Sequence, residues 1–164
     1  HCAIHTKGIM QDLLARELVG YGKRWLGKQI VQVSTTTIDQ VRGIAQRFDG
    51  EDINTIANQI STLGAALSGY RSMTIARTET HSIANWSSDE VAKATGDNIE
   101  KQWAATIDGR TRDDHADADG EVVKMGRMFE VGGEELEYPG DPNGSQKKLI
   151  QCRCQALYID LDYQ

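Results

Sequence analysis

The spacing of apolar residues changes along the chain, and this change limits the folds open to it. From residue 10 to residue 94, apolar residues recur mostly every three or four positions, as on one face of a helix. From residue 103 onward they alternate with polar residues or flank glycine turns, as strands do. We therefore predict an α+β fold, with N-terminal helices packed on a small C-terminal antiparallel sheet that carries long polar loops.

The individual elements follow from the same patterns. A helix at 87–94, separate from the one before it, is predicted because Ser87 and Glu90 stand at capping-box spacing. Gly132-Gly133 suits the tight turn of a hairpin. The segment from 110 to 120 is polar throughout, so we expect it to lie outside the core. The other helices are predicted at 10–18, 38–48, 53–63 and 72–86, and the strands at 103–107, 128–131, 135–138 and 149–159.

Composition excludes several classes of protein. The 164 residues are 39% hydrophobic and 26% charged, which is typical of one globular domain. No apolar run approaches the roughly 18 residues of a membrane helix, and the N-terminus has no apolar core of a signal peptide. Because the chain starts at His1 without Met, we expect a fragment or a processed product. The net charge of −6 argues against a general nucleic-acid binder, although a local basic face is compatible with it.

Two of the three cysteines form a C-x-C unit near the end of the chain. In a strand, Cys152 and Cys154 would point to the same side and could present two sulfurs to one zinc ion, with His115 as a third ligand. C-x-C is not the usual zinc spacing, however, and no fourth ligand is evident. A disulfide between the two cysteines would be strained, because its loop is too tight for normal geometry. Two alternatives stay open: two small buried hydrophobic residues, or a Cys152–His115 nucleophilic pair. Cys2 and His5 form a weaker candidate for metal binding at the N-terminus.

The acidic segment 113–120 imitates a calcium-binding loop. With Asp119-Gly120 at the fifth and sixth places, His115 stands at the first place, where an aspartate should be, and Gly126 replaces the bidentate glutamate of the twelfth place. We expect a solvated acidic loop here.

Arginines provide the last group of candidate site residues. Guanidinium groups bind carboxylates or phosphates through paired hydrogen bonds, so the set fits either substrate binding or an internal network that orients loops. The internal network is the favoured interpretation. The arginines are Arg77, Arg110, Arg112 and Arg153, and their candidate carboxylate partners are Glu79, Asp108 and Asp119.

Taken in order, these motifs resemble a known family, the phage head-morphogenesis or minor capsid proteins typified by the F protein of phage Mu. The resemblance covers the chain from about Thr35 to Leu157, so we assign 35–164 to that domain and 1–34 to an N-terminal helical extension. The quoted motifs are Ile75–Thr80, Trp103–His115, Asp119-Gly120, Phe129, Tyr138–Pro142 and Cys152–Cys154. The positions carried over are Arg77, Glu79, Trp103, Asp108, Arg110, Arg112, His115, Asp119, Gly120, Cys152, Arg153 and Cys154.

The resemblance implies a minor head protein of a tailed phage or prophage, taken into the procapsid. Its partners would be the portal and the major capsid or scaffold proteins, with packaged DNA as a further candidate and no membrane. It would reside in the virion, in the capsid interior or at the portal vertex, after assembly in the host cytoplasm. It does not imply an enzyme. The alternatives are a zinc-dependent hydrolase, either protease or nuclease, built on the His115 and C-x-C residues, and a toxin-associated packaging domain.

Overall fold

The computed structural model describes residues 44, 52–63, 69–95 and 98–163, which belong to two units, 1–79 and 80–164. Each unit is described by itself. The predicted helix at 10–18 and the Cys2–His5 candidate lie outside the described residues. So does the predicted helix at 38–48, apart from Ile44, which is helical and buried.

Helix α3 (Ile53–Ser61) of the first unit confirms the helix predicted at 53–63. Its start is fixed by Asp52, whose carboxylate accepts hydrogen bonds from the backbone N–H groups two and three residues on, at 2.8 and 3.3 Å. These bonds satisfy donors that the first turn of a helix leaves unpaired. The buried face of α3 joins a small core made of Ile44, Ile56, Ala57, Ile60 and Ala76.

Helix α4 (Tyr70–Thr95) is one continuous helix of 26 residues, so the predicted break at Ser87 is wrong. The hydroxyl of Ser87 donates to the carbonyl of Ile83 at 2.5 Å, and that of Ser88 donates to the carbonyl of Ala84 at 3.0 Å. Serine hydroxyls make this bond to the preceding turn when they stand inside a helix. The same residue type therefore indicated a helix start where none exists.

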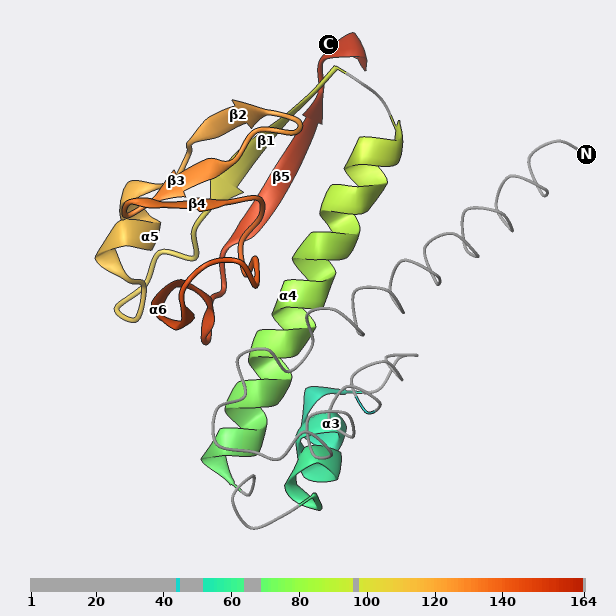
Figure 1. Ribbon diagram of the computed structural model, residues 1–164, viewed down its shortest axis with the longest axis vertical. Helices are drawn as coiled ribbons and strands as arrows, with labels where there is room; N and C mark the ends of the chain where they lie inside the picture. Colours follow the sequence, from blue (N-terminus) through green and yellow to red (C-terminus); the bar gives the residue numbers. More distant parts are fainter. Residues whose placement is uncertain (1–43, 45–51, 64–68, 96–97, 164) are drawn as a thin grey trace, which may run out of the picture. The chain divides into compact units, whose positions relative to one another are not determined.

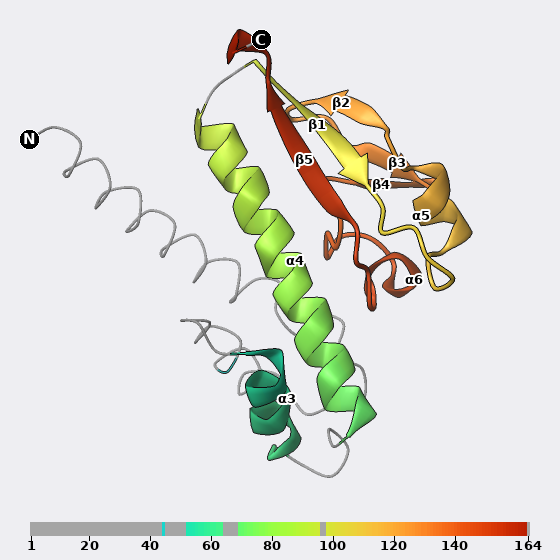
Figure 2. The same ribbon diagram turned by 180° about the vertical axis from the view of Figure 1, so that it is seen from behind.

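The second unit contains a three-stranded antiparallel sheet in the order β2 (Val122–Lys124), β1 (Ile99–Ala104), β5 (Gln155–Asp160). The second half of α4 runs alongside β5 (Figures 1 and 2), where the Asn85 side chain accepts a hydrogen bond from the backbone N–H of Ala156. The α+β prediction is confirmed.

Two of the predicted strand ranges are wrong. The first strand begins at Ile99 and ends at Ala104, instead of covering 103–107, because the Asp119 carboxylate takes the backbone N–H of Ala105 at 2.8 Å. The last strand begins only at Gln155. The residues before it, predicted as strand from 149, form the end of the short helix α6 (Gln146–Leu149) and an irregular segment.

Strands β3 (Phe129–Val131) and β4 (Glu134–Leu136) confirm the predicted hairpin. Gly132 and Gly133 at its turn both have positive φ, 56° and 80°, as a primed turn requires. Next to the hairpin, the short helix α5 (Asp113–Asp117) corrects another expectation. The polar segment 110–120 does reach the core, because it buries His115 and Ala118.

The hairpin turn offers a matched pair of substitutions. A Cβ atom at Gly132 would stand 2.8 Å from the Cβ of Asp114 and closer still to the Nζ of Lys148, whereas one at Gly133 meets nothing within 4 Å. Both positions carry the strain of positive φ. We expect Gly133→Ala to lower the free energy of unfolding by about 1 kcal/mol and Gly132→Ala to lower it by at least about 2 kcal/mol. Equal losses in urea unfolding would show that the Asp114–Lys148 contact does not constrain the turn.

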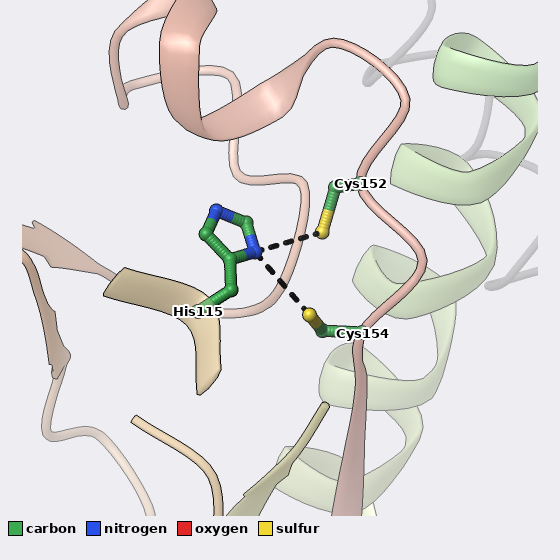
Figure 3. A group of neighbouring side chains, drawn as sticks. All are labelled: His115, Cys152 and Cys154. Atoms are coloured by element: carbon green, nitrogen blue, oxygen red, sulfur yellow. Dashed lines mark hydrogen bonds between the residues drawn. The ribbon is translucent and has the colours of Figure 1, made fainter. Parts of the chain in front are cut away.

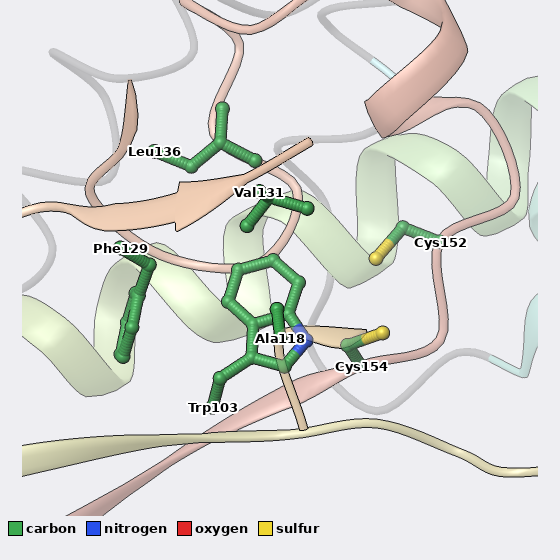
Figure 4. Close-up of a cluster of buried hydrophobic side chains, with 7 residues drawn as sticks. All are labelled: Trp103, Ala118, Phe129, Val131, Leu136, Cys152 and Cys154. Atoms are coloured by element: carbon green, nitrogen blue, oxygen red, sulfur yellow. The ribbon is translucent and has the colours of Figure 1, made fainter. Parts of the chain in front are cut away.

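The core of the second unit lies between the sheet, the hairpin and α5 (Figure 4). Trp103 stands at its centre, 1% exposed, with its ring edge-to-face against Phe129 at a centroid distance of 5.4 Å. Such aromatic pairs add to the stability gained by burial. The members of this core are Trp103, Ala118, Phe129, Val131, Leu136, Cys152 and Cys154.

Candidate functional site: a buried imidazole and two thiols

The two cysteines of the core meet His115 at one point (Figure 3). The Nδ1 atom of His115 lies 3.3 Å from the sulfur of Cys154 and 3.8 Å from the sulfur of Cys152. The three side chains lie within 4.8 Å of one another through these atoms, and each is no more than 4% exposed. We call these three residues the His–Cys cluster. The structure thus brings together the three residues that the sequence proposed as metal ligands.

The reason for their proximity differs from the predicted one. Neither cysteine lies in a strand; both belong to the irregular segment between α6 and β5. The backbone N–H of Cys152 donates to the carbonyl of Leu149 at 2.9 Å, and Gln151, one of the two residues between them, has φ of 57°. The carbonyl of Cys154 accepts a hydrogen bond from the side chain of Asn85 at 3.4 Å. A turn and a bond to α4, not strand alternation, direct both sulfurs to His115.

The two thiols of the cluster do not ionise alike. Hydrogen bonds from Cys152 and from His115 lower the pKa of Cys154 because they stabilise its thiolate, and they outweigh the opposing effect of burial. The pKa of Cys152 is raised, first because its thiol proton is engaged in the hydrogen bond to Cys154 and second because the thiol is buried. Cys154 is therefore the more acidic of the two thiols, and its sulfur is also the nearer one to the imidazole.

The other nitrogen of His115 faces a carboxylate. Its Nε2 atom lies 4.0 Å from the Oδ1 atom of Asp114, and both atoms are buried without a hydrogen-bond partner among the described residues. The second oxygen of Asp114 contacts the Nζ of Lys148. Burial opposes ionisation of Asp114, but Lys148 prevails and lowers the pKa of that carboxyl. An ionised carboxylate therefore stands behind the imidazole.

Access to the cluster is restricted. An open hollow of about 690 Å³ lies beside α5, and its lining includes Arg112, Asp114 and Lys147 but neither cysteine. Trp103 covers another side of His115, with ring centroids 5.7 Å apart. A nucleophilic thiol has to reach its substrate, and a reactive cysteine is usually partly exposed. The geometry therefore favours a role within the fold over a Cys–His nucleophile.

The signature arginines and acids of the second unit make internal contacts. Arg153 donates two hydrogen bonds to the Asp108 carboxylate, at 2.6 and 2.7 Å. Arg112 donates to the carbonyl of Ile150, two residues before Cys152. Gly120, at φ of 83°, donates its N–H to the Trp103 carbonyl at 2.8 Å. These contacts hold the loops that flank the His–Cys cluster.

Three other signature arginines and acids lie at the edge of the Arg153 pair or in the first unit. Arg110 is 79% exposed and lies 3.7 Å from Asp108, at the edge of the Arg153 pair. Arg77 and Glu79 belong to the first unit, where Arg77 is exposed and Glu79 is buried.

The Asp108–Arg153 pair makes stability depend on acidity. The hydrogen bonds from Arg153 and from the N–H of Arg110 hold the pKa of Asp108 well below its ordinary value of 3.8. A depressed pKa stabilises the fold above the unfolded value and ceases to do so as pH falls through the folded value. We expect Asp108→Asn to lower the melting temperature by a similar amount at about pH 6 and at about pH 4, and the difference from the wild type to shrink as the pH falls from about 4 toward about 2. A difference that stays constant between about pH 4 and about pH 2 would contradict the pairing.

Sequence reasoning missed a second buried polar cluster. Lys101 and Asp89 are both fully buried with their charged atoms 3.4 Å apart, and Tyr158 donates to the same Asp89 oxygen at 3.2 Å. Lys93 contacts the other oxygen at 2.8 Å. Burial opposes the charge of Lys93, but its bonds to Asp89 and Glu137 raise its pKa. Lys101 was missed because the first strand was predicted to begin at Trp103. A strand beginning at Ile99 places Lys101 on the inward face of the sheet.

The fold and the site together define a small α+β domain that secures its polar loops through a buried imidazole–thiol cluster and arginine contacts. The family described as Phage Mu protein F like protein matches residues 39–157, and the chain belongs to that family. The resemblance proposed from the ordered motifs is thereby confirmed.

Two characterised proteins are similar to the chain. It is 34% identical over 115 residues to the NAD(+)--arginine ADP-ribosyltransferase EFV of Enterococcus faecalis, an alignment that covers 68% of this chain and 23% of that protein. It is 30% identical over 115 residues to the minor head protein GP7 of Bacillus phage SPP1, covering 67% of this chain and 36% of that protein. The chain thus spans well under half the length of either relative. No solved structure matched it.

Proposed function

We propose that the chain acts in head morphogenesis of a tailed phage or prophage, as a minor head protein. The observation that carries this proposal is the family match over 39–157. The 30% identity to a protein of phage SPP1 supports the proposal, because that relative is named a minor head protein. In this role the chain would reside in the virion with other capsid components.

The mode of action that we propose is interaction, with the portal and the major capsid or scaffold proteins as partners during assembly and DNA delivery. Support comes from the inward contacts of the signature residues. Arg153 is paired with Asp108, Arg112 with a backbone carbonyl, and the His–Cys cluster is buried. Residues that serve substrate turnover usually line an accessible pocket.

None of the described helices is long and apolar enough to cross a membrane.

Co-expression tests the partner proposal. The chain, tagged at its C-terminus, would be produced together with the portal, major capsid and scaffold proteins of the phage or prophage that encodes it. We expect the portal or a capsid component to co-purify with the tagged chain at physiological salt. An unrelated acidic protein of similar size is the control for non-specific retention. Recovery of the chain without any head component would overturn the proposed mode of action.

A second candidate follows from the Enterococcus faecalis relative, which is named as an arginine ADP-ribosyltransferase and is 34% identical to the chain over 115 residues. If transferase activity resided in the shared segment, this chain would modify arginine acceptors with NAD⁺. Incubation with labelled NAD⁺ and an arginine-rich acceptor tests this directly. The head role predicts no transfer above an enzyme-free control, and transfer that depends on the chain would favour the second candidate.

A further inference from the structure

The separations within the His–Cys cluster correspond to those of a metal site. Zinc bound at about 2.3 Å from sulfur and about 2.0 Å from nitrogen, at tetrahedral angles, sets nitrogen and sulfur about 3.5 Å apart and two sulfurs about 3.8 Å apart. The two distances from Nδ1 of His115 are 3.3 and 3.8 Å, which lie on either side of that value. All three donor atoms fall within 4.8 Å of one another. The two sulfurs are at most 4.8 Å apart, so a zinc ion would require them to approach each other by no more than about 1 Å.

The surroundings of His115 match the outer shell of a histidine ligand. A histidine that binds metal through one nitrogen usually donates its other N–H to a carboxylate or a carbonyl. Asp114 Oδ1 stands 4.0 Å from Nε2 of His115, and both atoms are buried without a partner among the described residues. A small rotation of the ring would join them while Nδ1 turned toward the ion. Lys148 holds the other oxygen of Asp114.

The backbone next to the thiols is held in an uncommon conformation. Gln151 is the one non-glycine residue of the described chain with positive φ, at 57°, and it directly precedes Cys152. Such backbone geometry is costly for a residue with a Cβ atom and clusters at functional sites. Here it turns the Cys152 sulfur toward His115, which lies 37 residues earlier in the sequence. A small N- and S-donor site is formed by two segments that only the fold brings together.

We propose that His115, Cys152 and Cys154 bind one zinc ion, which ties α5 to the segment before β5. Nitrogen and thiolate donors of this kind favour zinc over the hard cations calcium and magnesium. The three protein ligands leave one coordination position for a water molecule. Because the ligands come from α5 and from the segment before β5, the ion stabilises the same region of the second unit that the arginine contacts hold. This proposal is independent of the head role.

Metal analysis with matched variants tests the site. The chain would be purified under reducing conditions, loaded with excess zinc, desalted and analysed by inductively coupled plasma mass spectrometry. We expect one zinc ion per wild-type chain, and zinc binding at least about tenfold weaker for Cys154→Ser and His115→Ala in chelator competition. Val131→Ala is the control, because it removes apolar contacts from the same core without removing a ligand. It should retain zinc.

Two measurements on the wild type keep the test independent of whether variants fold. Cobalt(II) added in place of zinc should give a thiolate-to-cobalt absorption band and the strong visible bands of tetrahedral coordination. Zinc loading should also raise the melting temperature of the wild type and leave that of Cys154→Ser unchanged. Only the weak spectrum of six-coordinate cobalt, or less than one-tenth of a zinc ion per chain, would overturn the proposal. So would equal zinc content in the wild type and Cys154→Ser, or a Cys152–Cys154 disulfide that persists in reducing buffer.

Discussion

Replacing Lys101 with Met is expected to lower the free energy of unfolding by about 3 kcal/mol. Lys101 is fully buried beside Asp89, donates to the carbonyl of Glu137 at 2.5 Å, and lies 5.3 Å from the centre of the Phe129 ring. Removing one partner of a buried ion pair leaves the other charge buried with less compensation. Lys93 still contacts Asp89 in the variant, so the loss falls at the low end of the range for such pairs.

Chemical denaturation followed by tryptophan fluorescence measures this loss. Lys93→Met is the control, because Lys93 is one-third exposed and contacts the same carboxylate. We expect it to cost about 1 kcal/mol or less, as partly exposed pairs do. The double variant Lys101→Met/Asp89→Leu should recover part of the loss, since it leaves no unpaired charge. If Lys101→Met and Lys93→Met are equally stable, the buried pair does not support the fold as described.

Replacing Trp103 with Ala is expected to cost about 3–5 kcal/mol. Trp103 is 1% exposed and contacts both Phe129 and His115 edge-on, so its removal leaves a large cavity at the centre of the core. Ile107→Ala is the control, because Ile107 stands four residues further on and is 63% exposed. Its replacement should change stability by less than about 0.5 kcal/mol. Circular dichroism of thermal unfolding follows both variants, and similar melting temperatures would refute the central position of Trp103.

Local chemistry explains which elements could be predicted from the sequence. The helix at 53–63 was found because its apolar spacing and its Asp52 cap both lie in the local sequence. The hairpin was found because only glycines readily adopt the two positive φ angles of its turn. The break at Ser87 was wrong because a serine hydroxyl serves equally well inside a helix. A local sequence pattern predicts a helix or strand reliably only when it is compatible with a single backbone conformation.

The candidate site shows where long-range contacts are required. The sequence suggested that His115 and the two cysteines share a site, but for the wrong reason, since neither cysteine is in a strand. The pairing depends on the turn at Gln151 and on Asn85, which no spacing reveals. The polar segment around His115 was expected outside the core because its charged side chains have no evident partner nearby in the sequence. The partner of Asp114 is Lys148, which lies 34 residues further along the chain.

The head role is the central claim, and mass spectrometry of purified heads tests it most directly. Heads and procapsids would be separated on a density gradient from an induced lysate of the strain that encodes the chain. We predict peptides from residues 98–163 in the same fractions as the portal protein, and their absence from those fractions when the major capsid gene is deleted. Recovery of the chain only among unassembled proteins, while the portal is found in heads, would contradict the account.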